Sequence, residues 1–385
     1  MSGSAGFIYS SAIEKYSFGP DHPFNSQRLI LTLDLLLKSG ILTQEEWIKP
    51  EPATMEQLLL AHDAAYIDAV RHLSTEVDKT SLVHGLGSED TPVFKDMHQA
   101  SSLIVGGSIL AAKLVMDGYL THAVNLAGGL HHAMRSKASG FCIYNDPVAA
   151  IAFIRQKYGA RVAYIDIDAH HGDGVQAAFY DDPHVLTISI HETGRYLFPG
   201  TGTVQDKGVG EGYGYTVNLP MDAFTEDDSW LKSFAAVVPV ITEYFRPDII
   251  VTTNGCDTHT LDPLTHLCCT TRSFATAQHI THKLAHNLCE GRLVAFGGGG
   301  YDWWNVVPRA WSLLWSEFSG RTLPERLPDS WVEAWRASAG TELIPTFLDD
   351  INQFPPIPRR DEIEEKNELT VRRVLQEYTY RFNKS

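Results

Sequence analysis

Five titratable side chains crowd the segment Y-I-D-I-D-A-H-H-G-D-G, residues 164–174. The segment follows an apolar run typical of a buried strand, and alternation along that strand would put Asp166 and Asp168 on one face, roughly 7 Å apart. His170 and Asp173 follow in the next loop. Carboxylate oxygens and imidazole nitrogens suit a divalent metal ion such as Zn²⁺. For the D-x-D pair alone, a salt-bridged network is the simpler interpretation.

A further carboxylate, Asp257, ends another apolar run in T-T-N-G-C-D-T-H, residues 252–259. We therefore predict Asp168, His170 and Asp257 as metal ligands. Three protein ligands leave one position open for water, which is typical of a catalytic zinc site rather than a structural one. The same donors also accept Fe²⁺, so the identity of the metal stays open.

A histidine pair, His131 and His132, follows a third apolar run in A-G-G-L-H-H-A, residues 127–133. Adjacent side chains point in different directions, so we expect two separate histidine–carboxylate pairs rather than two ligands of one metal. Asp166 and Asp173 are the free carboxylates that would orient the two imidazoles. Such histidines can take a proton from water and return it to a leaving amine.

The glycine run F-G-G-G-G-Y-D, residues 296–302, matches neither phosphate-binding glycine motif. We expect the glycines to let the backbone approach the site and to turn Tyr301 inward, where its hydroxyl would donate to an oxyanion. A tyrosine of the core is the alternative. His171 has no evident part in this chemistry, so we expect a structural role for it.

The elements that must position these residues alternate along the chain. Short apolar runs typical of strands lie at residues 123–127, 161–168, 185–190, 248–253 and 292–296. Helices are expected between them, including 97–116 and 228–245, the second kinked at Pro239. This alternation predicts an α/β fold with a parallel sheet covered by helices on both faces.

The amino-acid composition of the chain excludes some classes of function. The 385 residues carry a formal charge of −16, which argues against a nucleic-acid binder and mildly favours cationic substrates. The five cysteines show no C-x-x-C spacing, which indicates a reducing compartment. Neither a secretory signal nor an apolar run of about 18 residues is apparent, so we expect a cytoplasmic protein that does not enter a membrane.

The last part of the chain differs in composition. From about residue 320 it is richer in Pro and charge, and P-P-I-P-R-R-D-E-I-E-E-K (355–366) indicates a solvated connection. Val371, Val374, Leu375 and Tyr378 then recur at helical spacing. We expect this helix to dock on its own chain, with docking on a partner in a homo-oligomer as the alternative. One domain is predicted for residues 1–385, with a catalytic core at about 7–320 and a helical extension at about 321–385.

Seven motifs together resemble the zinc-dependent histone deacetylase family, and most closely its bacterial branch, the acetoin-utilisation proteins. The resemblance spans about residues 7–320. The motifs occur in family order: G-L-G-S-E-D-T-P-V-F (85–94), G-G-L-H-H-A (128–133), S-G-F-C-I-Y-N-D (139–146), D-I-D-A-H-H-G-D-G (166–174), F-P-G-T-G (198–202), D-T-H-T-L-D-P-L (257–264) and G-G-G-G-Y (297–301).

This resemblance implies the arginase–deacetylase fold, a three-layer α/β/α domain with a central parallel sheet, and removal of acetyl groups from lysine side chains. It places zinc on Asp168, His170 and Asp257. It makes His132 the general base and acid and His131 its electrostatic companion. Tyr301 would polarise the substrate carbonyl, and Asp166 and Asp173 would be the partners of the histidine pair.

The resemblance also implies a substrate channel with walls of Phe141 and Phe198, Gly140 on its floor and Leu264 near its rim. Asp90 matches a rim carboxylate that grips the substrate backbone. Leu264 is not acidic, which disfavours an acetylpolyamine deacetylase. That activity, a non-catalytic acetyl-lysine binder and an arginase-like enzyme with two manganese ions are the alternatives.

Monovalent cations are further implied by the resemblance. A K⁺ site would use the region of Asp166, Asp168, His170, Ser189 and Ile190, and a second K⁺ site would lie near Phe179 and Tyr215. Cys256 departs from the small apolar residue that many relatives have beside the ligand Asp257.

Overall fold

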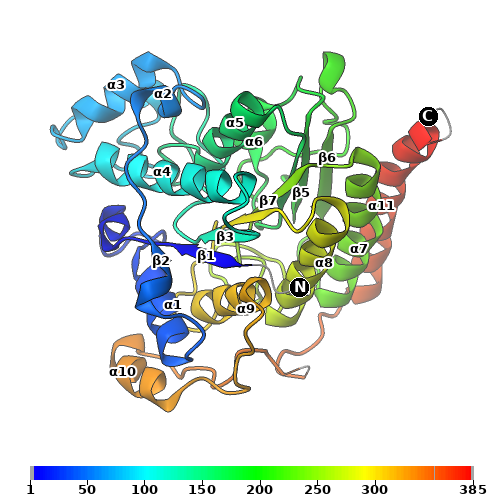
Figure 1. Cartoon of the computed structure of the whole chain (residues 1–385). Helices are drawn as coiled ribbons and strands as arrows, with labels where there is room; N and C mark the ends of the chain where they lie inside the picture. Colours follow the sequence, from blue (N-terminus) through cyan, green and yellow to red (C-terminus); the bar gives the residue numbers. More distant parts are fainter. Residues whose placement is uncertain (1–3, 351, 383–385) are drawn as a thin grey trace.

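One parallel sheet organises the computed structural model, which describes residues 4–350 and 352–382 (Figure 1). Among these residues its eight strands run in the order β2-β1-β3-β8-β7-β4-β5-β6, and every neighbouring pair is parallel. Their bounds are β1 Ala5–Ile8, β2 Trp47–Ile48, β3 His122–Asn125, β4 Val162–Asp166, β5 Val185–Glu192, β6 Thr216–Met221, β7 Ile249–Thr253 and β8 Leu293–Phe296.

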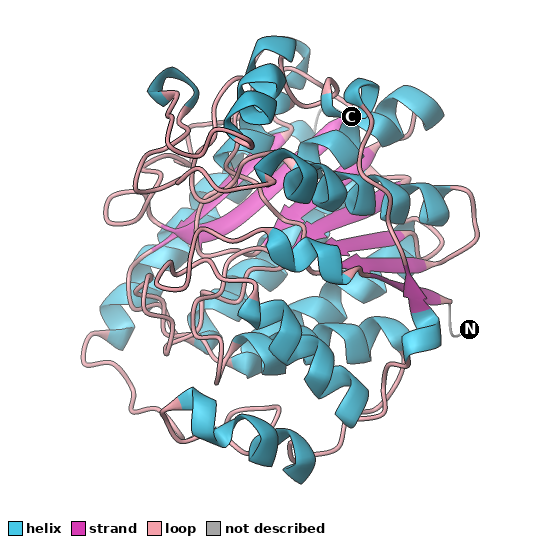
Figure 2. Ribbon diagram, turned by 90° about the vertical axis from the view of Figure 1, so that its left-hand side faces the viewer, coloured by secondary structure: helices cyan, strands magenta, loops and turns pink. Residues whose placement is uncertain are grey.

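Helices cover both faces of the sheet, as Figures 1 and 2 show. One face carries α2 Met55–Leu58, α3 Ala64–Leu73, α4 Met97–Met116, α5 Asp146–Tyr158 and α6 Asp173–Ala178. The other carries α1 Gln27–Lys38, α7 Asp227–Phe245, α8 Thr271–Leu288, α9 Val307–Ser319 and α11 Arg360–Phe382, with α10 Asp329–Ala339 against α1. The predicted three-layer α/β fold with a central parallel sheet is confirmed.

The local sequence explains these elements. Every residue of the central strands β3, β8, β7 and β4 is buried, as expected for strands covered on both faces. Helix α5 begins after Asn145, whose side chain accepts a hydrogen bond from the Val148 amide, and it ends at Gly159 in the left-handed conformation. The predicted helices 97–116 and 228–245 correspond to α4 and α7, and α7 contains Pro239.

Two expectations about the strands were wrong. Strand β4 ends at Asp166 instead of Asp168, because the Asp166 carboxylate accepts the Asp168 amide at 3.1 Å and turns the chain out of the sheet. Asp166 and Asp168 are therefore not alternate residues of one strand face. Strands β1, β2 and β6 were not predicted. Two of these are very short, and Pro220 weakens the strand pattern of β6, which lies at an edge of the sheet where proline is tolerated.

Helix α4 is the one described helix that is long and apolar enough to cross a membrane. In the structure 72% of its most apolar window is buried inside the protein. It packs against β1, β3 and β8 and against α5. Burial of this kind is typical of a core helix.

The C-terminal extension packs back onto the rest of the chain. Val374 and Tyr378 of α11 are buried against α7 and β6, and the Tyr378 hydroxyl donates to the carbonyl oxygen of Gly214 at 2.7 Å. Trp331 of α10 joins Leu31 and Leu35 of α1 in a second apolar cluster. The apolar face of the terminal helix is thus covered by its own chain. The division into a core and an extension stays a prediction.

Candidate active site

The chemically interesting residues lie at one edge of the sheet. They are in the loops that follow β3, β4, β7 and β8, which are neighbours in the order β3-β8-β7-β4. Because the strands are parallel, their carboxyl ends meet at that edge, where open α/β sheets bind ligands. This topology brings together side chains that are as much as 170 residues apart, His131 and Tyr301 among them.

The three predicted metal ligands converge. His170 Nδ1 lies 3.1 Å from Asp168 Oδ1 and 2.9 Å from Asp257 Oδ2. All three side chains are buried, and their ligand atoms lie within 4.8 Å of one another. Backbone amides fix the carboxylates: Gly299 donates to Asp168 Oδ2 at 2.6 Å, and Ala169 donates to Asp257 Oδ1 at 2.8 Å.

The electrostatics of this triad fit a divalent cation. Two carboxylates are buried around one imidazole, and burial together with the Asp168 charge raises the pKa of Asp257 to about 6. Such a pair of buried acids is costly without a compensating positive charge. The surrounding glycines leave the space that the triad needs: a Cβ on Gly299 would lie 2.1 Å from Asp257 Oδ2, and one on Gly255 would lie 2.1 Å from Asp168 Oδ2. An ion held here would be bound by Asp168, His170 and Asp257.

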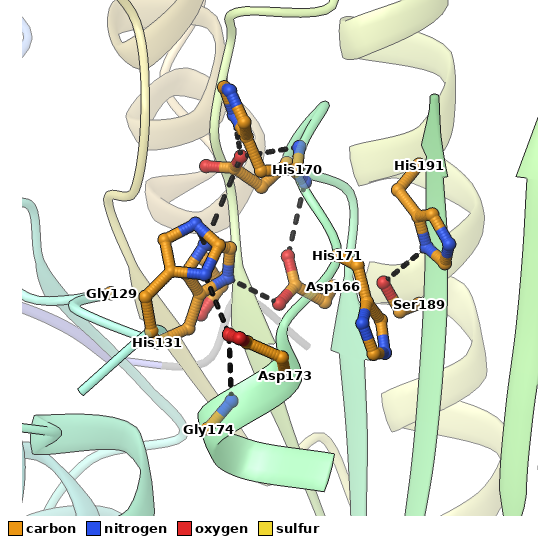
Figure 3. Close-up of polar contacts among 12 residues, drawn as sticks. Gly129, His131, Asp166, His170, His171, Asp173, Gly174, Ser189 and His191 are labelled. Carbon is orange, nitrogen blue, oxygen red and sulfur yellow. Dashed lines mark hydrogen bonds and ion pairs between the residues drawn. The ribbon is translucent and has the colours of Figure 1, made fainter. Parts of the chain in front are cut away.

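Two histidine–aspartate pairs stand beside the triad. His131 Nδ1 lies 2.7 Å from Asp166 Oδ2, and His132 Nδ1 lies 2.7 Å from Asp173 Oδ1. Figure 3 shows His131 facing Asp166, and Asp173 between the histidines and the Gly174 amide. In each pair the carboxylate fixes the hydrogen on Nδ1, so that Nε2 is the atom presented to the site. The structure therefore brings together the pairs that the sequence predicts.

The directions of the two histidines were predicted wrongly. Their rings converge, with the Nε2 atoms 3.0 Å apart and the ring centroids 4.0 Å apart. Burial alone would lower the pKa of His131, but the carboxylates of Asp166 and Asp168 raise it to about 9. Burial and the adjacent His131 lower the pKa of His132 to about 4. The two pKa shifts are opposite in direction, so a proton on this pair is held by His131 rather than by His132.

Two residues that the sequence analysis missed hold the histidine loop in place. The carboxylate of Asp146 accepts the Gly129 and Leu130 amides at 3.1 and 2.9 Å. Asn145 donates through Nδ2 to the carbonyl oxygens of His131 and Ala133. Both residues are buried at the start of α5. The helix-start pattern N-D-P was the available signal, because an N-cap side chain is also free to bind neighbouring backbone.

Tyr301 is placed by its backbone. Its amide donates to Asp262 Oδ2 at 2.8 Å, and buried Arg28 donates to the carbonyl oxygen of Gly298 at 2.7 Å. The ring of Tyr301 stands perpendicular to that of His170, with centroids 6.3 Å apart. The ring of Tyr301 therefore lies beside the metal triad. Asp262 and Arg28 were missed, because each acts through the backbone of a distant segment.

Aromatic rings border the site on two sides. Phe198 is 45% exposed and lies edge-on to His132 with centroids 5.0 Å apart, while Phe141 lies 5.9 Å from the ring of Tyr301. Both Gly140 and Phe141 have positive φ angles. Asp90 Oδ2 accepts the Gly140 amide at 2.7 Å, so part of the predicted rim carboxylate is used inside the chain. Leu264 is half-buried, and its amide donates to Asp262.

Two of the residues predicted to lie near K⁺ are on neighbouring strands of the sheet. Asp166 is paired in register with Ser189, which precedes buried Ile190 on β5. The second predicted region contains Phe179, just after α6, and Tyr215, just before β6. His171 has neutral partners, Thr201 Oγ1 at 2.8 Å and Gln176 Oε1 at 2.9 Å, which fits the structural role expected for it. Figure 3 shows it beside Ser189 and His191.

Comparison with known proteins agrees with this fold. Residues 22–318 match the family described as the histone deacetylase domain, and the chain belongs to the histone deacetylase family. It is 50% identical to the acetoin utilization protein AcuC of Bacillus subtilis (strain 168), over 96% of each chain. It is 43% identical to AcuC of Staphylococcus xylosus, over 97% of this chain and 98% of that one.

Solved structures show the same likeness. A crystal structure of an HDAC homolog complexed with SAHA has a TM-score of 0.84 and 30% identity, and covers 95% of this chain and all of that one. An HDAC homolog from Aquifex aeolicus gives a TM-score of 0.82, also at 30% identity. The predicted resemblance to the histone deacetylase family, and within it to the acetoin-utilisation proteins, is confirmed.

Proposed function

We propose that this deacetylase is a zinc-dependent amidohydrolase that removes acetyl groups from lysine side chains of proteins or peptides. The observation that carries the proposal is the convergence of Asp168, His170 and Asp257 beside the His132–Asp173 pair. A zinc ion bound there would act as a Lewis acid toward the acyl carbonyl and would lower the pKa of water.

Side chains of the protein carry out the proton transfers and stabilise the oxyanion. His132 is kept neutral by burial and by its cationic neighbour His131, so it takes a proton from the attacking water. The same imidazole then donates that proton to the departing lysine Nζ. Asp173 holds the ring so that Nε2 is the reactive atom, and Asp166 does the same for His131. Tyr301 donates from its hydroxyl to the oxyanion that forms on the acyl group.

The substrate class follows from the walls of the site. Phe141 and Phe198 offer apolar faces to an extended alkyl stem, and the free oxygen of the Asp90 carboxylate is available to a substrate backbone amide. Leu264 supplies no negative charge near the rim, which favours an acetyl-lysine peptide over an acetylpolyamine. We further propose that K⁺ binds near Asp166 and Ser189, and that the protein works in the cytoplasm, where its five free cysteines would stay reduced.

A substrate panel tests this function. Enzyme stripped of metal and reloaded with Zn²⁺ or Fe²⁺ would be assayed on acetyl-lysine peptides, longer acyl-lysine peptides and acetylpolyamines, with SAHA as a competitor. We expect the highest kcat/KM on an acetyl-lysine peptide with Zn²⁺. A higher kcat/KM on acetylpolyamines would overturn the proposed substrate, and failure to turn over any acyl-lysine peptide with either metal would overturn the function.

A further inference from the structure

A second group of metal-ligating side chains lies far from the candidate active site. His122 opens β3, and His282 and His286 lie one turn apart in the last part of α8. His282 Nε2 is 3.1 Å from His122 Nε2 and 3.1 Å from His286 Nε2, and the three ligand atoms lie within 4.8 Å of one another. We call these three residues the histidine cluster. It is at the amino end of β3, the edge of the sheet opposite the loops that carry the candidate active site.

The hydrogen bonding of His282 leaves its Nε2 as an electron-pair donor. Its Nδ1 lies 2.8 Å from Glu317 Oε1, and a carboxylate only accepts, so the hydrogen of the neutral ring is on Nδ1. The single lone pair on Nε2 then faces the Nε2 atoms of both His122 and His286. It cannot accept an equally good hydrogen bond from each of them. A metal ion among the three nitrogens would use all of them, and the carboxylate behind His282 is the usual outer partner of a metal-bound histidine.

The geometry and burial fit a tetrahedral ion with an open position. Zinc–nitrogen bonds of about 2.0–2.1 Å place two ligand nitrogens about 3.3–3.4 Å apart in a tetrahedron, close to the observed 3.1 Å. His122 is 1% exposed, so its imidazole is shielded from solvent. Phe318 packs against His122 and His282, whereas His286 is exposed and gives access from solvent.

We propose that the histidine cluster binds a divalent transition-metal ion, Zn²⁺ in the first place, at a site separate from the candidate active site. Three imidazoles suit zinc, copper or nickel and disfavour Mg²⁺ and Ca²⁺, which prefer oxygen ligands. The bound ion links the start of β3 to the end of α8, and Glu317 of α9 supplies a negative charge against His282.

The experiment counts zinc ions per chain. Protein without a polyhistidine tag would be stripped with a chelator, dialysed against Zn²⁺ and measured by mass spectrometry of the metal. We expect one ion fewer in His286→Ala than in the wild type, because His286 is an exposed ligand whose removal leaves the core intact. Glu317→Gln should keep the ion at saturation but bind it about 10- to 100-fold more weakly, as removal of an outer partner does.

His279→Ala is the matched control. His279 is on the same helix, is half exposed and also contacts Glu317 Oε1 at 3.0 Å, but it lies outside the cluster. The His279→Ala variant should bind as many zinc ions as the wild type. An equal ion count in the wild type and His286→Ala would overturn the proposal, as would loss of the same ion in His279→Ala. The difference between variants does not depend on the candidate active site, whose own ion is tested by Asp257→Ala.

Discussion

Gly140 lies against the imidazole of His132 and leaves no room for a side chain. Its φ is +55°, and an added Cβ would lie 2.3 Å from His132 Cδ2 and 2.6 Å from His132 Cγ. Ordinary contact begins at 3.4 Å, so the shortfall at Cδ2 is about 1.1 Å. Gly140→Ala must therefore move the imidazole or the loop by about that distance.

A displacement of about 1 Å in a catalytic group can cost roughly 100-fold in rate. We accordingly expect kcat of Gly140→Ala on an acetyl-lysine peptide to fall about 100-fold, equivalent to about 2.7 kcal/mol of activation free energy. Bound zinc should be retained, because the clash is with His132 and not with the metal ligands. The assay is steady-state deacetylation with zinc content measured on the same samples.

Gly159→Ala is the matched control for backbone strain. Gly159 has a similar φ of +63°, but a Cβ there would meet nothing within 4 Å. Both variants should lose about 1–2 kcal/mol of stability from the left-handed conformation, and only Gly140→Ala should lose activity. A Gly140→Ala enzyme with wild-type kcat would refute the role assigned to the position of His132.

Three further predictions concern the oxyanion, the C-terminal extension and pH. Tyr301→Phe should fold, bind zinc and lose about 100- to 1,000-fold in kcat; unchanged kcat would exclude Tyr301 as the oxyanion donor. Asp349→Ala should lower the free energy of unfolding by about 3–5 kcal/mol, because it leaves buried Arg309 without the carboxylate 2.8 Å away, whereas exposed Asp350→Ala should change it little. Denaturant unfolding measures both, and equal effects would contradict the reasoning. Burial lowers the pKa of His62 from 6.5 to about 4, and its Nε2 accepts the Asn145 amide, so the folded state resists protonation. The unfolded chain takes up that proton first, so stability should be lost as pH falls from about 6.5 to about 4, by about 3 kcal/mol from this residue, and His62→Gln should show a shallower loss between those pH values.

The sequence was most informative about features that one short segment determines, such as a buried strand. Continuous apolar runs predicted β3, β4, β5, β7 and β8. The rule that parallel strands share a carboxyl edge predicted that Asp168, His170 and Asp257 lie close together. Strand alternation failed at Asp168 because a local hydrogen bond from its amide to Asp166 competes with the sheet.

Residues that act through distant backbone could not be predicted in this way. Asp146 and Asp262 lie within two of the motifs and Arg28 in none, but no motif names their partners, which are fixed only when the loops meet. The histidine cluster is a similar case. His282 and His286 share a helix face, but His122 is 160 residues earlier in the chain and joins them only through the packing of α8 near β3.

If Asp257 binds the metal and His132 transfers protons, substitutions at the two positions should have different effects. Zinc content and deacetylation rate should be measured together in His132→Ala and Asp257→Ala, both in a His286→Ala background so that the histidine cluster contributes no ion. We expect Asp257→Ala to lose both the zinc and the activity. His132→Ala should keep the zinc and lose at least about 100-fold in kcat. A His132→Ala enzyme that loses the ion, or that keeps the ion and turns over at the rate of its parent, would contradict this account.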